Sequence, residues 1–150
     1  MSYVKEVLQP GETILFASTI HWLTYGPAIL LLIVAIDATF WAGEGHEFIW
    51  RSISLLLLAA SLLSAARAWF IRWTTEIAVT DRRIIYKRGF IRRHTIEMNM
   101  EKVESVDVNQ SLFGRIFDYG DVLVRGTGVG FEPLHMIEYP IALRNAVTAR

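Results

Sequence analysis

The stretch WLTYGPAILLLIVAIDATFW, residues 22–41, decides the fold, and a second stretch of the same kind, WRSISLLLLAASLLSAARAW, follows at residues 50–69. Both are framed by tryptophans and are almost wholly apolar between them. At a rise of about 1.5 Å per residue, a helix of this length covers about 30 Å, the thickness of a bilayer's hydrocarbon core. Tryptophan favours the headgroup boundary, where its ring is buried and its N–H stays hydrated. We therefore expect two membrane-spanning helices with interfacial anchors at Trp22, Trp41, Trp50 and Trp69.

Two other classes of protein carry long apolar stretches, and the sequence argues against both. A cleaved signal peptide has a basic leader and ends in an A-x-A site, whereas only Lys5 precedes the first stretch and no such site follows it. A buried helical hairpin of a soluble protein needs far more surrounding chain than residues 74–150 supply. The sequence therefore predicts a transmembrane hairpin.

The charges on either side of this hairpin predict its orientation. The connector 42–49 contains acidic residues and a histidine but no lysine or arginine. Basic residues near a span stay on the cytoplasmic side, and here they lie at the end of the second stretch and after it, at Arg67, Arg72, Arg82, Arg83, Lys87 and Arg88. We expect a multi-pass protein of the cytoplasmic (inner) membrane with both termini in the cytoplasm. Its expected parts are a cytoplasmic leader at 1–21, a hairpin at 22–72 with an outer loop at 42–49, and a cytoplasmic domain at 73–150.

Two features inside the hairpin leave alternatives open. Asp37 and Arg51 fall in the same leaflet, and we predict that they pair across the hairpin, which would lower the desolvation cost of both charges. Alternatively, each draws water to the interface by itself. Small residues at Ala60, Ser64 and Ala68 form a stripe that lets helices approach closely. This stripe serves either packing against the first span or self-association into a homo-oligomer.

The sequence from Thr74 onward is β-rich and predicts a small antiparallel sheet or half-barrel that a C-terminal helix after Pro140 closes. Apolar and polar residues alternate along it, as in half-buried strands. The apolar run TILFASTI at 13–20 is expected to pair with an edge of this sheet or to lie along the membrane face. Together with the hairpin, these elements give an α+β membrane protein. The expected strands are 74–79, 83–87, 90–98, 102–108, 121–125 and 134–138, with a short turn of helix within 109–119.

Several motifs carry a resemblance to a known family. TDRRIIYKRG at 80–89, VESVDVNQS at 103–111 and GRIFDYG at 114–120 resemble motifs of the membrane-flanked bacterial pleckstrin-homology-like (PH-like) domain family. LQPGE at 8–12 and the pair His21-Trp22 are similar to the leader of that family. The resemblance implies two strongly bent sheets with a capping helix, held at the inner membrane face. It implies a fold rather than a defined biochemical activity.

A cluster of basic residues on one predicted hairpin is the main binding candidate. Basic residues close to an anionic leaflet contribute about 1 kcal/mol each. Strand alternation divides the cluster, however, because Arg82 and Arg88 point one way and Arg83 and Lys87 the other, which disfavours a stereospecific lipid pocket. The cluster is either attracted to anionic lipid or solvated and paired with the acidic residues that follow it. The lipid- or partner-binding candidates are Arg82, Arg83, Lys87, Arg88, Arg92 and Arg93, with Phe131 in the glycine-rich loop as a further contact.

No pattern in the sequence indicates catalysis. Cysteine is absent, the four histidines are scattered, and no G-x-S-x-G elbow occurs. The segment RGTGVGFEP at 125–133 has phenylalanine where a dinucleotide fingerprint has glycine, and no helix is expected after it. We therefore expect no enzyme activity, no metal and no cofactor.

The sequence as a whole predicts a non-enzymatic, membrane-anchored PH-like module that binds protein partners or the anionic lipid surface. The alternative is an accessory subunit of a transport, secretion or membrane-protein quality-control complex that contacts its partners through the transmembrane helices. A formal net charge of +0 gives no indication of a nucleic-acid partner.

Overall fold

The computed structural model describes residues 3–41, 46–90, 94–127 and 133–149. The chain forms two compact units, one made of Met1–His21 together with Ile71–Arg150 and the other of Trp22–Phe70. The leader and the C-terminal part thus fold as one domain, although the hairpin separates them in sequence.

The hairpin unit is helical along both apolar stretches. A 3-10 turn, η1 (Trp22–Tyr25), leads into α2 (Gly26–Phe40), which has a proline in its first turn, where a missing N–H costs least. The second helix, α3 (Glu47–Thr74), has 28 residues. It begins inside the connector predicted at 42–49 and continues past Trp69, so the predicted span at 50–69 lies within it. Residues 42–45, between the two helices, lie outside the described residues.

Small polar and small apolar side chains hold α2 and α3 together. Ser54 Oγ donates to the carbonyl of Ala35 and Ser61 Oγ to the carbonyl of Ala28, both at 2.8 Å. Both pairs repeat at seven residues, which is two helical turns, so they lie on one face of each helix. Of the predicted stripe, Ala68 is buried, Ser64 is half-buried and Ala60 is exposed, and self-association through it stays a prediction.

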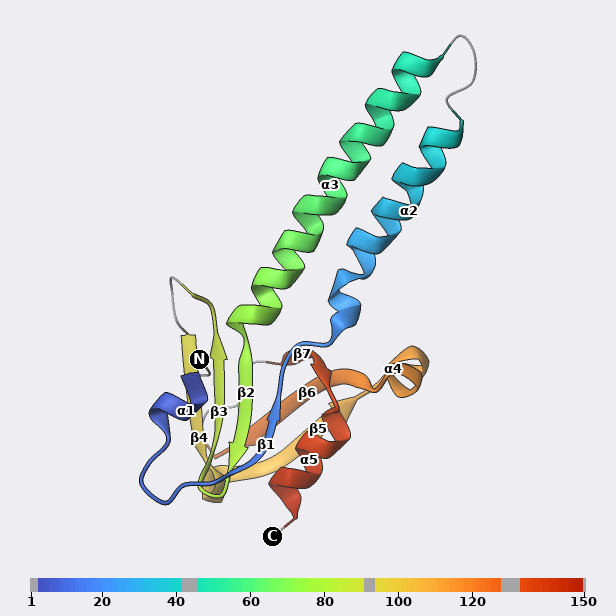
Figure 1. Cartoon of the computed structure of the whole chain (residues 1–150). Helices are drawn as coiled ribbons and strands as arrows, with labels where there is room; N and C mark the ends of the chain where they lie inside the picture. The colour runs from blue at the N-terminus through green and yellow to red at the C-terminus, as the bar shows by residue number, and fades with distance from the viewer. Residues whose placement is uncertain (1–2, 42–45, 91–93, 128–132, 150) are drawn as a thin grey trace. The chain divides into compact units, whose positions relative to one another are not determined.

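The larger domain begins with a four-stranded antiparallel sheet. Its order is β1 (Ile14–Ser18), β2 (Glu76–Thr80), β3 (Arg83–Arg88) and β4 (His94–Asn99). The pairing of β1 with β2 confirms that the apolar leader adds a strand to the sheet edge. Figure 1 shows β1 running beside β2, although more than fifty residues separate them.

A short helix, α1 (Tyr3–Val7), covers one face of this sheet and was not predicted. Val4 and Val7 pack there against Ala78 of β2 and Ile85 of β3. For this reason β2 is buried on both faces along Ile77–Thr80, where alternation predicted a half-buried strand. The opposite face of the sheet joins the main core.

A three-stranded antiparallel sheet and a helix complete the domain. After the 3-10 turn η2 (Met100–Lys102), its order is β5 (Val103–Asn109), β6 (Tyr119–Gly126) and β7 (Leu134–Glu138). The short helix α4 (Leu112–Phe117) lies between β5 and β6, and α5 (Pro140–Thr148) buries Leu143 and Val147 in the core. These elements confirm the predicted helical turn and closing helix. The core side chains come from both sheets and from α5, and include Ile77, Val79, Ile84, Val122, Val124, Leu134 and Ile137.

The leader joins the two sheets after β1 ends. Ile20 forms a bridge with Ile137 of β7, and the amide of Glu138 donates to the carbonyl of Thr19 at 3.1 Å. Ser18 Oγ also donates to the carbonyl of Glu138 at 2.6 Å. The leader is therefore part of the domain's hydrogen-bonded framework.

Candidate functional site

The leader is fixed to the first sheet by a tight turn. In LQPGE, Pro10 and Gly11 occupy the centre of a four-residue turn in which the amide of Glu12 donates to the carbonyl of Gln9 at 2.9 Å. Gly11 has φ of +80°, as the third residue of a type II turn requires. The turn directs the Glu12 carboxylate under the sheet, where its side chain is fully buried.

A network of hydrogen bonds surrounds that carboxylate. Arg83 donates to both Glu12 oxygens, at 3.0 and 2.9 Å, and Thr80 Oγ1 donates to Glu12 Oε1 at 2.7 Å. Burial raises the pKa of Glu12, but the hydrogen bonds from the Gln9 amide, Arg83 and Thr80 and the Arg83 charge outweigh it and lower the pKa to about 2. These partners come from two of the motifs of the sequence, LQPGE and TDRR, which the network joins.

Arg83 is committed to the framework and is not available to a ligand. Its guanidinium also reaches Glu97 Oε2 and the carbonyl of Val7, both at 2.8 Å. Its pKa is raised, first by the hydrogen bond with Glu12 and further by Glu97. Of the two interpretations of the basic cluster, internal pairing with the following acidic residues holds for Arg83.

The remaining described members of the basic cluster are less firmly held than Arg83. Lys87 Nζ lies 4.9 Å from the centre of the Tyr3 ring, on the α1 side of the sheet with Arg83. Arg82 and Arg88 are both exposed. The predicted contacts Arg92, Arg93 and Phe131 lie outside the described residues. The cluster thus offers two exposed arginines.

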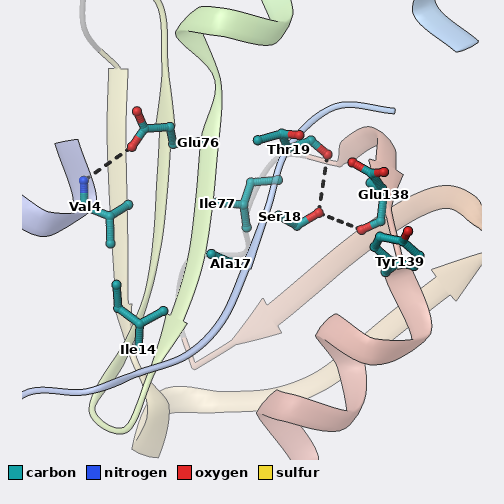
Figure 2. A pocket seen from close by; sticks show the side chains of 9 residues that line it. All are labelled: Val4, Ile14, Ala17, Ser18, Thr19, Glu76, Ile77, Glu138 and Tyr139. Atoms are coloured by element: carbon teal, nitrogen blue, oxygen red, sulfur yellow. Dashed lines mark hydrogen bonds between the residues drawn. The ribbon is translucent and has the colours of Figure 1, made fainter. Parts of the chain in front are cut away.

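A pocket of about 260 Å³ follows β1, between α1 and the end of β7. Figure 2 shows Val4 and Ile14 at one end of it and Ser18, Glu138 and Tyr139 at the other. Its polar groups are largely engaged in the framework, since Glu76 accepts from the amide of Val4 at 3.3 Å and Ser18 binds the Glu138 carbonyl. The lining contains neither histidine nor lysine beside a hydroxyl, so its chemistry suits binding of an apolar group. Nowhere in the described parts of the chain do three or more His, Asp or Glu side chains gather as metal ligands do.

Helix α4 displays apolar side chains on the surface of the domain, a feature that the sequence analysis missed. Of its six residues only Gly114 is buried, while Leu112, Phe113, Ile116 and Phe117 are between 43% and 77% exposed. The signal was present in SLFGRIF, where four large apolar residues share six positions with no polar face to balance them. Figure 1 shows α4 standing out at the turn between β5 and β6.

The predicted residues of the hairpin take mixed positions. Trp22, Trp41 and Trp69 are exposed on the hairpin unit, and Trp50 is half-buried. The predicted pair of Asp37 with Arg51 is wrong in this structure, because the Arg51 guanidinium contacts Glu47 at 2.9 Å instead. Glu47 lies one turn earlier on the same helix and needs no approach of a second helix.

The comparisons with known proteins identify the family. The family described as Bacterial PH domain matches residues 18–150. No curated protein and no solved structure matches the chain. The match extends from the last residue of β1 through both apolar helices and the second sheet to the C-terminus, and so includes the segment through which the leader joins the two sheets. On this evidence the chain belongs to the bacterial PH domain family.

Proposed function

We propose that this protein is a membrane-anchored PH-like interaction module whose hairpin crosses the cytoplasmic membrane and whose domain binds protein partners or anionic lipid in the cytoplasm. The observation that carries the proposal is the surface of the hairpin. Both helices are long and apolar enough to span a bilayer, yet only 17% and 6% of their most apolar windows are buried within the chain. A core helix of a soluble protein is mostly buried, so this hairpin needs an apolar solvent.

The proposed orientation of the hairpin in the membrane rests on the charges at its two ends. The basic residues Arg67 and Arg72 lie at the end of α3 that leads into the domain, whereas Arg51 at the other end is paired with Glu47 and the connector 42–49 has no lysine or arginine. Basic residues favour the cytoplasmic side of a span. Both connections between hairpin and domain, at His21 and Ile71, therefore belong on the cytoplasmic side.

The proposal assigns binding rather than catalysis to the domain. Family members have no known catalytic activity. The domain offers two exposed arginines, Arg82 and Arg88, and the apolar pocket beside β1. The arginines suit acidic groups on a partner or an anionic leaflet, and the pocket suits an apolar side chain of a partner.

Fractionation and affinity capture test the proposal with the full chain. The protein should remain with membranes after alkaline carbonate and urea washes, and release by these washes would contradict the membrane anchor. Partners captured in mild detergent should be reduced by Arg82→Gln with Arg88→Gln. The matched control is Arg125→Gln, which removes an exposed arginine from the other sheet where it pairs with Asp107 at 3.0 Å.

The alternative, an accessory subunit of a transport, secretion or quality-control complex, has its own supporting observation. The sides of α2 and α3 that face away from each other carry large exposed residues, among them Leu30, Leu56 and Leu63. These surfaces could pack on the helices of a larger complex. Capture of the same partners that is unaffected by the two arginine changes but lost on substitution of outward residues, such as Leu56→Ser with Leu63→Ser, would favour this alternative.

A further inference from the structure

Helix α4 is held rigidly although its side chains are exposed. The Ser111 hydroxyl caps its start by accepting the amide of Gly114 at 3.1 Å, and Asp118 ends it in the left-handed conformation. The side-chain amide of Gln110 donates to the carbonyls of Gly114 and Tyr119, at 3.2 and 3.1 Å. The chain therefore fixes the orientation of a helix that contributes almost nothing to the core.

The backbone at this helix has no room to move inward. A Cβ atom on Gly114 would lie 2.6 Å from the carbonyl oxygen of Tyr119, and one on Gly120 would lie 2.8 Å from the carbonyl oxygen of Asn109. Both glycines are in the motif GRIFDYG. This motif thus fixes the position of Leu112, Phe113, Ile116 and Phe117 without burying them. A rigidly presented apolar patch marks an interaction surface.

The position of α4 within the domain indicates what this surface meets. His21 is the last residue of the domain before the hairpin, and its ring stacks on Tyr119 with centroids 5.2 Å apart. Its amide also donates to the carbonyl of Met136 at 2.7 Å, which fixes the exit point of the chain. Consecutive Cα atoms are about 3.8 Å apart, so the last residue of α4, Phe117, lies within about 8 Å of Tyr119.

The second connection carries a similar surface. Trp73, next to the point where the chain re-enters the domain, packs against Phe90 with ring centroids 5.3 Å apart, and each is 54% exposed. If the hairpin crosses the bilayer, both connections lie at the lipid surface. The polar layer of each leaflet is about 5–8 Å thick, and α4 ends two residues before Tyr119, whose ring stacks on His21 at the exit point.

We infer that α4 inserts into the headgroup region of the same leaflet from which the hairpin emerges, and that lipid covers its exposed apolar side chains. Leu112, Phe113, Ile116 and Phe117 contact the upper acyl chains, and Arg115 lies exposed between them, where its guanidinium reaches phosphate headgroups. The contact holds the exposed Arg82 and Arg88 and the β1 pocket in a fixed orientation relative to the leaflet. This inference rests on the proposed function, since it needs the hairpin to be in the membrane.

Single-cysteine labelling of the full chain tests the inference, because the sequence has no cysteine of its own. Phe113→Cys, Leu62→Cys and Thr148→Cys each receive an environment-sensitive fluorophore in nanodiscs that contain lipids with spin-labelled acyl chains. Position 62 is an exposed residue in the middle of α3, and position 148 is exposed at the far end of α5. We expect strong quenching at 62, at least about half that quenching at 113, and little quenching at 148.

The other outcomes contradict the inference alone or the proposed function together with it. Quenching at 62 but not at 113 overturns the inference and leaves the proposed function intact. No quenching at 62 overturns the proposed function and the inference with it. Protection of position 113 from both lipid and aqueous quenchers overturns the inference in favour of a protein partner, and dependence of that protection on protein density identifies a second copy of the chain.

Discussion

The substitution Glu12→Gln tests how the leader is held to the domain. It keeps the size of the side chain but removes the charge that Arg83 and Thr80 bind in a fully buried position. A pKa lowered from 4.5 to about 2 corresponds to about 3 kcal/mol of preferential binding of the charged form. Arg83 keeps Glu97 as a partner, so we expect the folded domain to lose about 2–3 kcal/mol.

The same pair predicts a dependence on pH with a definite sign. Because the pKa of Glu12 is lower in the folded state, its contribution is fully present above about 4.5. The contribution is lost as the pH falls from about 4.5 to about 2. The Glu12→Gln variant should lack this part of the acid destabilisation.

Hydrogen exchange of the full chain in detergent measures both effects. Amides of β1, β2 and β3 should exchange faster in Glu12→Gln by the factor that corresponds to about 2–3 kcal/mol. The matched control is Asp107→Asn, which breaks an exposed pair of similar length and should change stability by less than about 1 kcal/mol. Equal exchange in Glu12→Gln and in the unsubstituted protein, or equal effects of the two variants, would refute the reasoning.

Two further substitutions test the packing of each unit. Gly120→Ala should destabilise the domain by about 1–3 kcal/mol in thermal unfolding, since its Cβ would meet Gln110 and Asn109 closer than 3.0 Å. The control is Gly26→Ala, where a Cβ has open space and the change should be neutral or stabilising. Equal effects of the two substitutions would contradict the close approach at Gly120. Ser61→Leu should separate α2 from α3 and cost about 1–3 kcal/mol in unfolding by sodium dodecyl sulfate in mixed micelles. Ala60→Leu, exposed on the same helix, is its control, and a loss as large as that of Ser61→Leu would argue against the observed seven-residue contact.

Local patterns predicted most of the elements of this fold. Alternation and the flanking turns located β3, β5 and β7 to within a residue or two. Where a second layer covers the sheet, the pattern failed. Helix α1 is only five residues long, and the sequence does not show that Val4 and Val7 cover Ala78 and Ile85.

Contacts between distant residues were the part that local patterns could not predict. Glu12 and Arg83 are 71 positions apart, and the turn at Gly11 together with the pairing of β1 and β2 brings them together. Arg51 was assigned to Asp37 from leaflet depth, but the nearer Glu47 on the same helix binds it. The apolar surface of α4 was visible in the sequence, yet its exposure depends on how Gln110, Gly114 and Gly120 pack the backbone of this region together.

The central claim is that the hairpin crosses the membrane and leaves both ends of the domain in the cytoplasm. The most direct measurement is labelling of Glu47→Cys and Thr148→Cys, in separate cysteine-containing variants, by a membrane-impermeant maleimide on intact bacterial spheroplasts. The account predicts that position 47 is labelled from outside and that position 148 is labelled only after the membrane is permeabilised. Labelling of position 148 on intact spheroplasts, or labelling of position 47 only after permeabilisation, would contradict it.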